Sequence, residues 1–358
     1  MLNLTIKSGA PEGNISMNES TNAVSKNIIG DNCILRDKFP LSQSGKVGDV
    51  YDTILIRHPN NATAGFKDPL SKIVNDIPSI EEYIEYINAN KIERANIIAN
   101  DIIFLTKCPT LKYLSISPSD KGIEKFDYSP LYEMPEIKEL GCRTVFGENG
   151  VFSTSVDYSK IHGLEFLRIG NSDKSFNFEK VQTLKTLVSR EYQGNDLYGL
   201  FRSPVLDTLE ISVSKIKTLN GIQQSNRMQC LYLHYNFSLC DIDALYHTKD
   251  SLRSLCIENC VKIKDFSVLG ELHNLERLIL IGSNRLPNLN FIKALPKLST
   301  FCFSFKVEDG DLSPCLSLPY VYCSKNYKHY NFKDKHFSKD KSKYSRGNDN
   351  IEVYRRLV

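Results

Sequence analysis

The sequence contains no tryptophan and only four methionines among 358 residues, and neither sign of charge is in marked excess. Its 45 Lys and Arg against 42 Asp and Glu give a net charge of +3. This near balance excludes a general electrostatic attraction to nucleic acid or to an anionic membrane. No apolar run approaches the roughly 18–20 residues that span a bilayer, so no membrane segment is expected.

The cysteines do not follow the spacing of a known metal-binding or redox motif. The ten cysteines are scattered from Cys33 to Cys323, with no CxxC pair and no Cys/His cluster at zinc-binding spacing. The chain starts MLNLTIKSGAPEGN, which lacks the charged segment and apolar stretch of a secretory signal. We therefore expect reduced, buried thiols, no metal and no cofactor. The protein is expected to be cytoplasmic, or a delivered effector without a recognisable signal.

The chain contains an internal repeat of the form L-x-x-L-x-L-x-x-N/C. The segments MQCLYLHYN from Met228 and LRSLCIENC from Leu252 match it, with Asn236 and Cys260 at position 9. Two further matches, from residues 206 and 275, have Ser at position 9. The segment LEFLRIGNS from Leu164 also fits, and looser or terminal copies start at residues 92, 111, 137, 184, 298 and 318. The eleven starts are about 19–27 residues apart, close to the spacing of leucine-rich repeats.

Physical chemistry explains the repeat. Side chains alternate across a strand, so positions 4 and 6 point inward from one short strand. Successive strands then stack into a parallel sheet, and the chain turns at position 9, where a short polar group can bond unpaired backbone. Asn236 begins an N-x-S sequon, but its place at position 9 predicts burial rather than glycosylation.

The linking segments extend this pattern. Residues 260–278 (CVKIKDFSVLGELHNLERL) and 283–301 (SNRLPNLNFIKALPKLSTF) resemble the short leucine-rich repeats of bacterial internalins and of a eukaryotic phosphatase regulator. The resemblance covers roughly residues 80–325 and blurs at 137–163. It implies an α/β solenoid, a leucine-rich-repeat horseshoe with a parallel sheet on its concave face and a cap at each end.

The ends divide the chain further. Residues 1–46 are rich in Ser, Asn and Gly and are expected to be flexible or irregular. Residues 47–91 are predicted to form an N-terminal cap, with a strand in 47–59 and a helix that starts with the capping box Ser79–Glu82. The solenoid of about ten to eleven repeats then spans 92–325.

The last segment, 326–358, forms a basic C-terminal cap or tail. From Lys325 to Val358 there are ten Lys and Arg against four Asp and Glu, and NYKHYNFKDKHF mixes basic with aromatic residues. One interpretation is a patch for phosphate, nucleic acid or an acidic partner. The other, which we favour, is a solvated cap followed by a loose end, because solenoid caps need polar outer faces.

No catalytic pattern is evident. The motifs of serine hydrolases, P-loop proteins and zinc proteases are missing, and the histidines occur singly. Function is therefore expected on the concave face, which is formed by positions 3, 5 and 7 of each repeat. Tyr and Arg favour protein interfaces, and apolar groups exposed on a sheet face suggest a partner. The candidate partner-binding residues are Phe166, Arg168, Arg190, Glu210, Tyr232, His234, Tyr235, Glu258 and Arg277.

These observations predict a non-enzymatic module, monomeric rather than oligomeric, that binds a folded protein by steric occlusion or scaffolding. In a bacterium it could be an immunity protein or an effector, an analogy at the level of the fold. The alternatives are a regulatory subunit of an enzyme such as a phosphatase, and phosphate or nucleic-acid binding through the basic tail. Neither membrane binding nor nucleic-acid binding is favoured by the charge.

Overall fold

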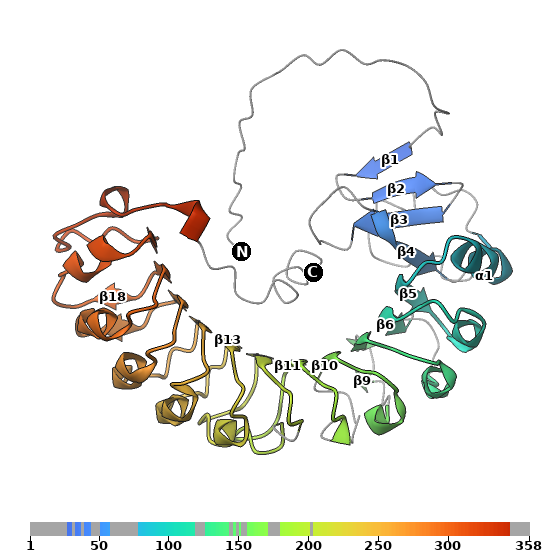
Figure 1. Ribbon diagram of the computed structural model, residues 1–358, viewed down its shortest axis with the longest axis horizontal. Helices are drawn as coiled ribbons and strands as arrows, with labels where there is room; N and C mark the ends of the chain where they lie inside the picture. Colours follow the sequence, from blue (N-terminus) through green and yellow to red (C-terminus); the bar gives the residue numbers. More distant parts are fainter. Residues whose placement is uncertain are drawn as a thin grey trace, which may run out of the picture.

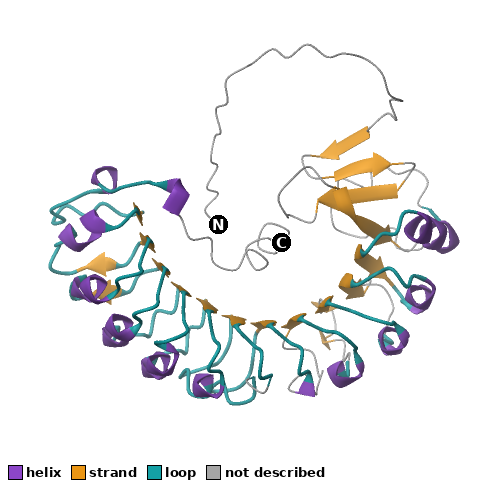
Figure 2. Ribbon diagram, in the orientation of Figure 1, coloured by secondary structure: helices purple, strands orange, loops and turns teal. Residues whose placement is uncertain are grey.

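The computed structural model describes residues 27–30, 33–36, 39–43, 51–57, 78–118, 126–142, 146–147, 150–151, 156–170, 180–200 and 203–343. The strands line the inner side of a horseshoe, and short helices lie along its outer side (Figures 1 and 2). Fifteen strands form one sheet, in which β1 to β4 pair antiparallel and the twelve strands from β4 to β19 pair parallel.

The strands of the main sheet are β1 (Asn27–Gly30), β2 (Cys33–Arg36), β3 (Phe39–Gln43), β4 (Tyr51–Arg57), β5 (Arg94–Ala99), β6 (Tyr113–Pro118), β7 (Glu139–Cys142), β10 (Phe166–Gly170), β11 (Thr186–Arg190), β12 (Thr208–Ser212), β13 (Cys230–His234), β14 (Ser254–Glu258), β15 (Arg277–Ile281), β17 (Thr300–Phe303) and β19 (Tyr320–Cys323). Two small sheets pair β8 (Phe146–Gly147) with β9 (Gly150–Val151), and β16 (Arg285–Leu286) with β18 (Lys306–Val307).

One α-helix, α1 (Ile80–Ala89), and ten 3-10 helices are described. The 3-10 helices are η2 (Ile103–Lys107), η3 (Ser129–Glu133), η4 (Tyr158–Lys160), η6 (Ile222–Gln224), η7 (Asp243–Thr248), η8 (Ser267–Glu271), η9 (Asn290–Ala294), η10 (Ser313–Ser317), η11 (Asp334–His336) and η12 (Lys341–Lys343). None of the helices in this part of the chain has the length and apolar character needed to cross a bilayer.

The predicted repeat phase is confirmed. In all eleven copies the strand begins at position 3, from Arg94 in β5 to Tyr320 in β19. Adjacent strands from β10 to β19 pair equal positions with equal positions. Positions 4 and 6, such as Leu231 and Leu233, are buried, except for the half-buried Ile169 of β10. Burial of each such side chain contributes about 1.5–3 kcal/mol, so the repeated leucines supply the main stabilisation of the solenoid.

A left-handed corner follows the strand in successive repeats. Glu191, Val213, Tyr235 and Asn259, all at position 8, have φ between 54° and 60°. Their N–H groups donate to the position-7 carbonyl of the next repeat, at 2.7–2.9 Å. The corner therefore extends the hydrogen-bond ladder beyond the strand, which offsets the roughly 1–2 kcal/mol that this backbone costs a residue other than glycine.

At position 9, the side chain of Asn236 fastens its corner to the preceding repeat. Asn236 is fully buried, as predicted: its Oδ1 accepts from the N–H and hydroxyl of Ser214, at 3.0 and 2.5 Å. Its Nδ2 donates to the Ile211 carbonyl at 3.0 Å. In the repeat from residue 275 the role passes from the exposed Ser283 to the buried Asn284. Gly282, with φ of 143°, shapes that corner differently, so the chain turns one residue later.

The N-terminal end is more regular than its composition suggests. Three antiparallel strands, β1 to β3, lie within the segment expected to be flexible or irregular, because short apolar stretches occur among its Ser and Asn residues. The predicted capping box is confirmed, since Ser79 Oγ accepts from Glu82 N–H and Glu82 Oε2 accepts from Ser79 N–H. Phe39 stacks on Tyr86, with ring centroids 4.0 Å apart. Residues 1–26 lie outside the described residues.

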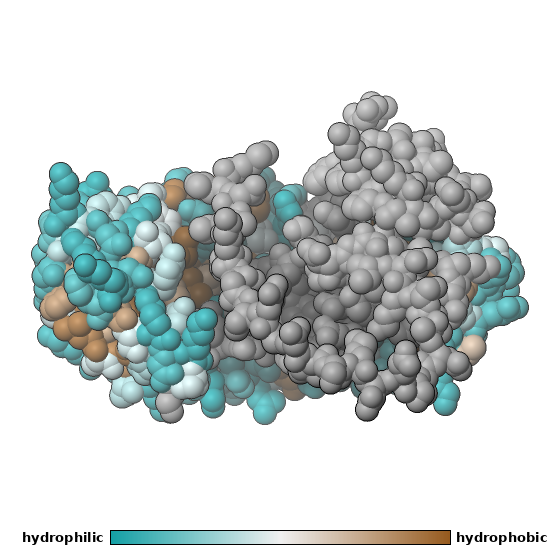
Figure 3. Space-filling model, turned by 90° about the horizontal axis from the view of Figure 1, so that it is seen from above, coloured by the Kyte–Doolittle hydropathy of each residue, from teal (hydrophilic) through white to brown (hydrophobic). Residues whose placement is uncertain are grey.

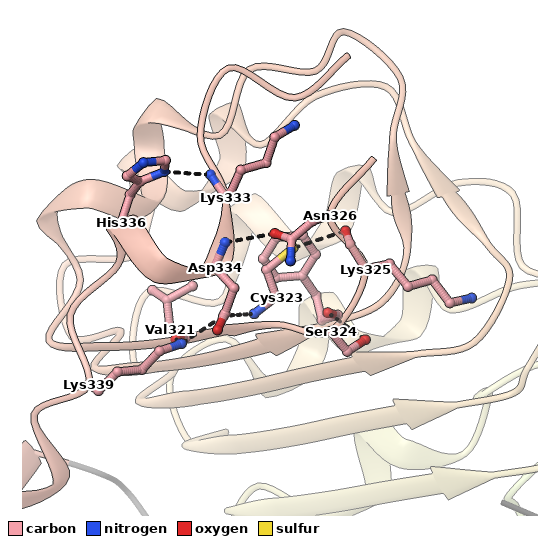
Figure 4. Close-up of polar contacts among 10 residues, drawn as sticks. Val321, Cys323, Ser324, Lys325, Asn326, Lys333, Asp334, His336 and Lys339 are labelled. Atoms are coloured by element: carbon pink, nitrogen blue, oxygen red, sulfur yellow. Dashed lines mark hydrogen bonds and ion pairs between the residues drawn. The ribbon is translucent and has the colours of Figure 1, made fainter. Parts of the chain in front are cut away.

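The C-terminal end closes over β19. The Asp334 carboxylate accepts from Cys323 N–H and from Lys339 Nζ, both at 2.7 Å, and its own N–H donates to Asn326 Oδ1 at 2.8 Å (Figure 4). Tyr330 and Phe337 are buried beside this network. Residues 326–343 thus pack as a cap, and Lys339, one of the basic residues of the predicted tail, is engaged in it. Residues 344–358 lie outside the described residues.

Candidate functional site

The concave face is formed by positions 3, 5 and 7 of the parallel strands. The register places the predicted site residues on six adjacent strands: Phe166 and Arg168 on β10, Arg190 on β11, Glu210 on β12, Tyr232 and His234 on β13, Glu258 on β14 and Arg277 on β15. Tyr235 lies just beyond β13, at the left-handed corner. The alternation of strand side chains was therefore sufficient to bring eight of the nine residues onto one face.

An apolar cluster lies at the centre of this face. Phe166, Val188, Tyr232 and Cys256 form it, separately from the solenoid core, and Ile279 packs against it. Phe166 and Tyr232 were expected to be exposed, and this expectation is wrong, because only 4% and 0% of their surfaces are accessible. Val188, Tyr232 and Cys256 are at position 5 of their strands and Phe166 is at position 3, so the side chains of two neighbouring columns pack together and bury one another. We call these residues the concave cluster.

Charged side chains lie within and beside the concave cluster. Arg277 is 3% exposed and donates from Nη1 to Ser254 Oγ at 3.2 Å. Glu210 is 8% exposed, between Val188 and Tyr232 on the neighbouring strands, and its buried Oε2 accepts no hydrogen bond from any described residue. Arg190, by contrast, is 62% exposed at the rim. The face therefore combines a buried carboxylate with an accessible cation.

Three groups form a polar constellation at the edge of β13. His234 Nδ1 lies 3.0 Å from Glu258 Oε2, and the Tyr235 hydroxyl donates to Glu258 Oε1 at 3.1 Å. Ser212 occupies the same position as His234 on the neighbouring strand. A Ser–His–Glu row resembles a nucleophilic triad in composition, but Ser212 and His234, both well within the described residues, share no hydrogen bond. The geometry instead shows Glu258 orienting the histidine and the tyrosine.

Burial disfavours ionisation of two thiols of the face, Cys230 and Cys302. Burial raises the pKa of Cys230 and of Cys302 to about 11, although the charge of nearby Arg277 acts in the opposite direction. A thiol with so high a pKa is a poor nucleophile at neutral pH. Among the described residues no group of three or more His, Cys, Asp or Glu side chains is placed to hold a metal ion.

A second charged arrangement, which was not predicted from the sequence, lies on the same face. Arg94 on β5 reaches across Tyr113 on β6 and forms an ion pair with Glu139 on β7, at 2.8 Å. Its guanidinium lies 4.2 Å from the centre of the Tyr113 ring. These residues share position 3 of three consecutive repeats, so the columns could have revealed the pair once their side chains were compared.

No model of a known protein family matches the sequence, and no curated protein matches it. Several solved structures are similar to the chain. An internalin (inlF) from Listeria monocytogenes is 18% identical, with 66% of this chain and 73% of that chain covered and a TM-score of 0.40. TLR13, in its complex with ssRNA13, is 18% identical, with 68% and 44% covered and a TM-score of 0.41. The leucine-rich repeat domain of the type III effector XopL is 13% identical, with 73% and 78% covered and a TM-score of 0.34.

Eleven strands of one curved parallel sheet each begin at the third position of a leucine-rich repeat. The chain adopts the leucine-rich-repeat fold. The apolar and hydrophilic side chains on the visible surface of this solenoid are mixed rather than segregated, with apolar patches set in a mostly hydrophilic surface (Figure 3). The binding surfaces of the solenoid are therefore identified one at a time, from the residues that form them.

The flank at the N-terminal ends of the strands carries an open hollow of about 400 Å³. Its lining is polar, and much of it is internally bonded: Lys297 Nζ donates to Asn274 Oδ1 at 2.6 Å, and Arg253 pairs with Glu276 at 3.4 Å. Ligand pockets for small molecules are mostly apolar with a few polar groups. This hollow of the leucine-rich-repeat solenoid therefore does not have the character of such a pocket.

Proposed function

We propose that this protein is a non-enzymatic binding module that recognises a folded protein partner through its concave face. The observation that supports this most directly is the strand register, which sets the charged residues of six adjacent strands on one face, around the buried concave cluster. Arg side chains are enriched at protein interfaces, where they make directional bonds. A partner bound there would be held by its fit to the curved sheet.

Burial divides the predicted residues by role. The concave cluster and Arg277 are buried, so they shape the floor of the face and hold it rigid. Glu210 Oε2 accepts no hydrogen bond from any described residue, and its burial makes Glu210 part of the floor of the face rather than an accessible contact. Arg190, whose side chain is well exposed, meets the partner first, whereas Tyr235 lies beyond the strand at the corner and is not among these contacts.

Binding across the concave face would act by steric occlusion or by scaffolding, because nothing in the arrangement requires chemistry on the partner. A toxin whose active surface is covered, or a host protein that is captured, would fit this mechanism. The choice between an immunity protein, an effector and a regulatory subunit depends on the partner, and its identification is the purpose of the experiment below.

The experiment compares two double variants in pull-downs from the cells that naturally produce the protein, with quantitative mass spectrometry. Arg190→Glu with Ile281→Asp changes the rim of the concave face. Lys293→Glu with Leu316→Asp makes matched changes on the outer side, on η9 and η10, where Lys293 and Leu316 are exposed. We expect the first variant to lose a partner by about tenfold or more and the second to retain it.

Equal recovery of every partner by both variants would refute recognition through the concave face. Urea unfolding of both proteins, with unchanged midpoints, is the control that the substitutions leave the fold intact. The identity of the recovered protein then distinguishes the roles: a toxin indicates immunity, and a phosphatase catalytic subunit indicates regulation.

A further inference from the structure

A second surface lies on the flank at the C-terminal ends of the strands, outside the concave face. Val213, Tyr235, Phe237 and Val261 are 41%, 42%, 53% and 38% exposed. They are four of the nine large apolar side chains that are exposed among the described residues, and they come from three consecutive repeats. We call them the flank patch. Single exposed apolar residues need no explanation, but a group on adjacent repeats suggests a contact site.

The backbone ladder makes these side chains neighbours. Val213 and Tyr235 are both at position 8, and their N–H groups donate to the next repeat at 2.9 and 2.8 Å. The Tyr235 and Phe237 rings meet edge to face, with centroids 6.2 Å apart. Phe237 follows Asn236 directly, as Val261 follows Cys260 at the same position of the next repeat, so these two side chains leave the solenoid at the same level.

The flank patch is held in place although it is exposed. The left-handed backbone at Tyr235 turns its ring away from the strand, and its hydroxyl is anchored to Glu258 at 3.1 Å. None of the four side chains belongs to the solenoid core or to the concave cluster. Preorganised aromatic groups of this kind lose little conformational entropy on binding, which favours their use in recognition.

Lysines surround the patch. Lys215 and Lys217 follow Val213 along the chain, and Lys262 and Lys264 follow Val261; all four are exposed. None of these four lysines forms an ion pair with another described residue. The carboxylates nearest to these lysines in sequence already accept hydrogen bonds from other groups. Asp241 Oδ1 accepts from Asp243 N–H and Asp265 Oδ1 accepts from Ser267 N–H, while Glu258 bonds to His234 and Tyr235.

We propose that the flank patch docks an acidic segment of a protein partner that also carries apolar side chains. The apolar groups would pack on Tyr235, Phe237 and the two valines, and the carboxylates would meet the four lysines. This surface is independent of the concave face, so either proposal can fail without the other. A second copy of the chain is disfavoured as the occupant, because its own lysines would then face these lysines.

A single-stranded nucleic acid is also disfavoured. Nucleic-acid surfaces of this type present aromatic rings on which successive bases stack. Here the two rings meet edge to face, valines stand on either side of them, and the Glu258 carboxylate is bonded to one ring and would repel a phosphate. Aliphatic side chains add contact area for an apolar residue but offer no stacking face for a base.

The test is a selection from a random peptide library displayed on phage, with the full chain as target. Selected peptides are counter-selected on a Phe237→Ser/Lys262→Glu variant, and their affinities are measured by fluorescence anisotropy. A matched variant, Tyr246→Ser/Lys293→Glu, alters an exposed aromatic and an exposed lysine on the outer side. Because all these positions are exposed, the variants should fold, and circular dichroism verifies it.

We expect enriched peptides to carry Asp or Glu together with apolar residues. Their affinity should fall about tenfold or more in the Phe237→Ser/Lys262→Glu variant and stay unchanged in the matched variant and in Arg190→Glu. Selection of peptides without acidic residues, or equal binding by all variants, would overturn the proposal. So would tighter binding of a labelled oligo-dT than of any selected peptide, or self-association that is lost in the Phe237→Ser/Lys262→Glu variant.

Discussion

Replacing Asn236 with Ala should be the most damaging single polar substitution in the middle of the solenoid. Asn236 is fully buried and joins two repeats through three hydrogen bonds, to the N–H and hydroxyl of Ser214 and to the Ile211 carbonyl. Alanine would leave the buried Ser214 N–H without its partner and would remove the bond to the Ile211 carbonyl, which lies in the paired strands β12 and β13. An unsatisfied buried group costs about 1–3 kcal/mol, so the free energy of unfolding should fall by about 1–3 kcal/mol.

The assay is urea unfolding followed by far-UV circular dichroism. Asn220→Ala is the matched control, because Asn220 is exposed and its side chain makes no hydrogen bond to another described residue; it should change stability by less than about 0.5 kcal/mol. If Asn236→Ala lowers the free energy of unfolding by less than about 1 kcal/mol, the buried hydrogen bonds of Asn236 do not stabilise the contact between the two repeats. A double-mutant cycle with Ser214→Ala should show a coupling of about 0.5–3 kcal/mol, since the two side chains share one bond.

Four further predictions concern one corner, the cap of the N-terminal helix and the thiols. Val213→Gly should raise the free energy of unfolding by about 0.5–1 kcal/mol, since Val213 holds φ of 55°, and a loss of stability in urea unfolding would contradict this. Ser79→Ala should cost about 1 kcal/mol by removal of the capping box, and unchanged thermal unfolding would count against that contribution. Because burial raises the pKa of Cys108 and Cys260 to about 11, stability should fall as pH rises from about 9 to about 11, where unfolded thiols ionise and folded ones do not. In the folded protein, peptide mapping after alkylation at about pH 8 should find the exposed Cys240 modified well before Cys108 or Cys260.

The repeat phase was predictable from the sequence because the solenoid core imposes a strict rule on positions 4, 6 and 9. Once Leu231 and Leu233 were assigned to the inside, the alternation of the strand assigned Tyr232 to the opposite face, and the burial of Asn236 followed from the turn. The capping box at Ser79 was equally readable, because it depends on residues three apart in one chain segment.

Properties that depend on contacts between repeats were not predictable. Phe166 and Tyr232 are buried because side chains of adjacent strands pack together. The residue types at one repeat position do not show how tightly those side chains pack. The antiparallel strands β1 to β3 lie outside the repeat, so no repeated pattern in the sequence predicted them. The flank patch lies at positions 8 and 10, which the rule leaves free, so Phe237 and Val261 stood out only after the corner conformation placed them side by side.

The central claim is that a folded protein is bound across the concave face. Site-specific photo-crosslinking in the cells that naturally produce the protein tests it most directly, with the photoreactive residue at Arg190 on the rim and, as control, at Lys293 on the outer side. We predict a discrete covalent adduct with one protein from position 190 and none from position 293. Adducts of equal yield from both positions, or from position 293 alone, would contradict the claim.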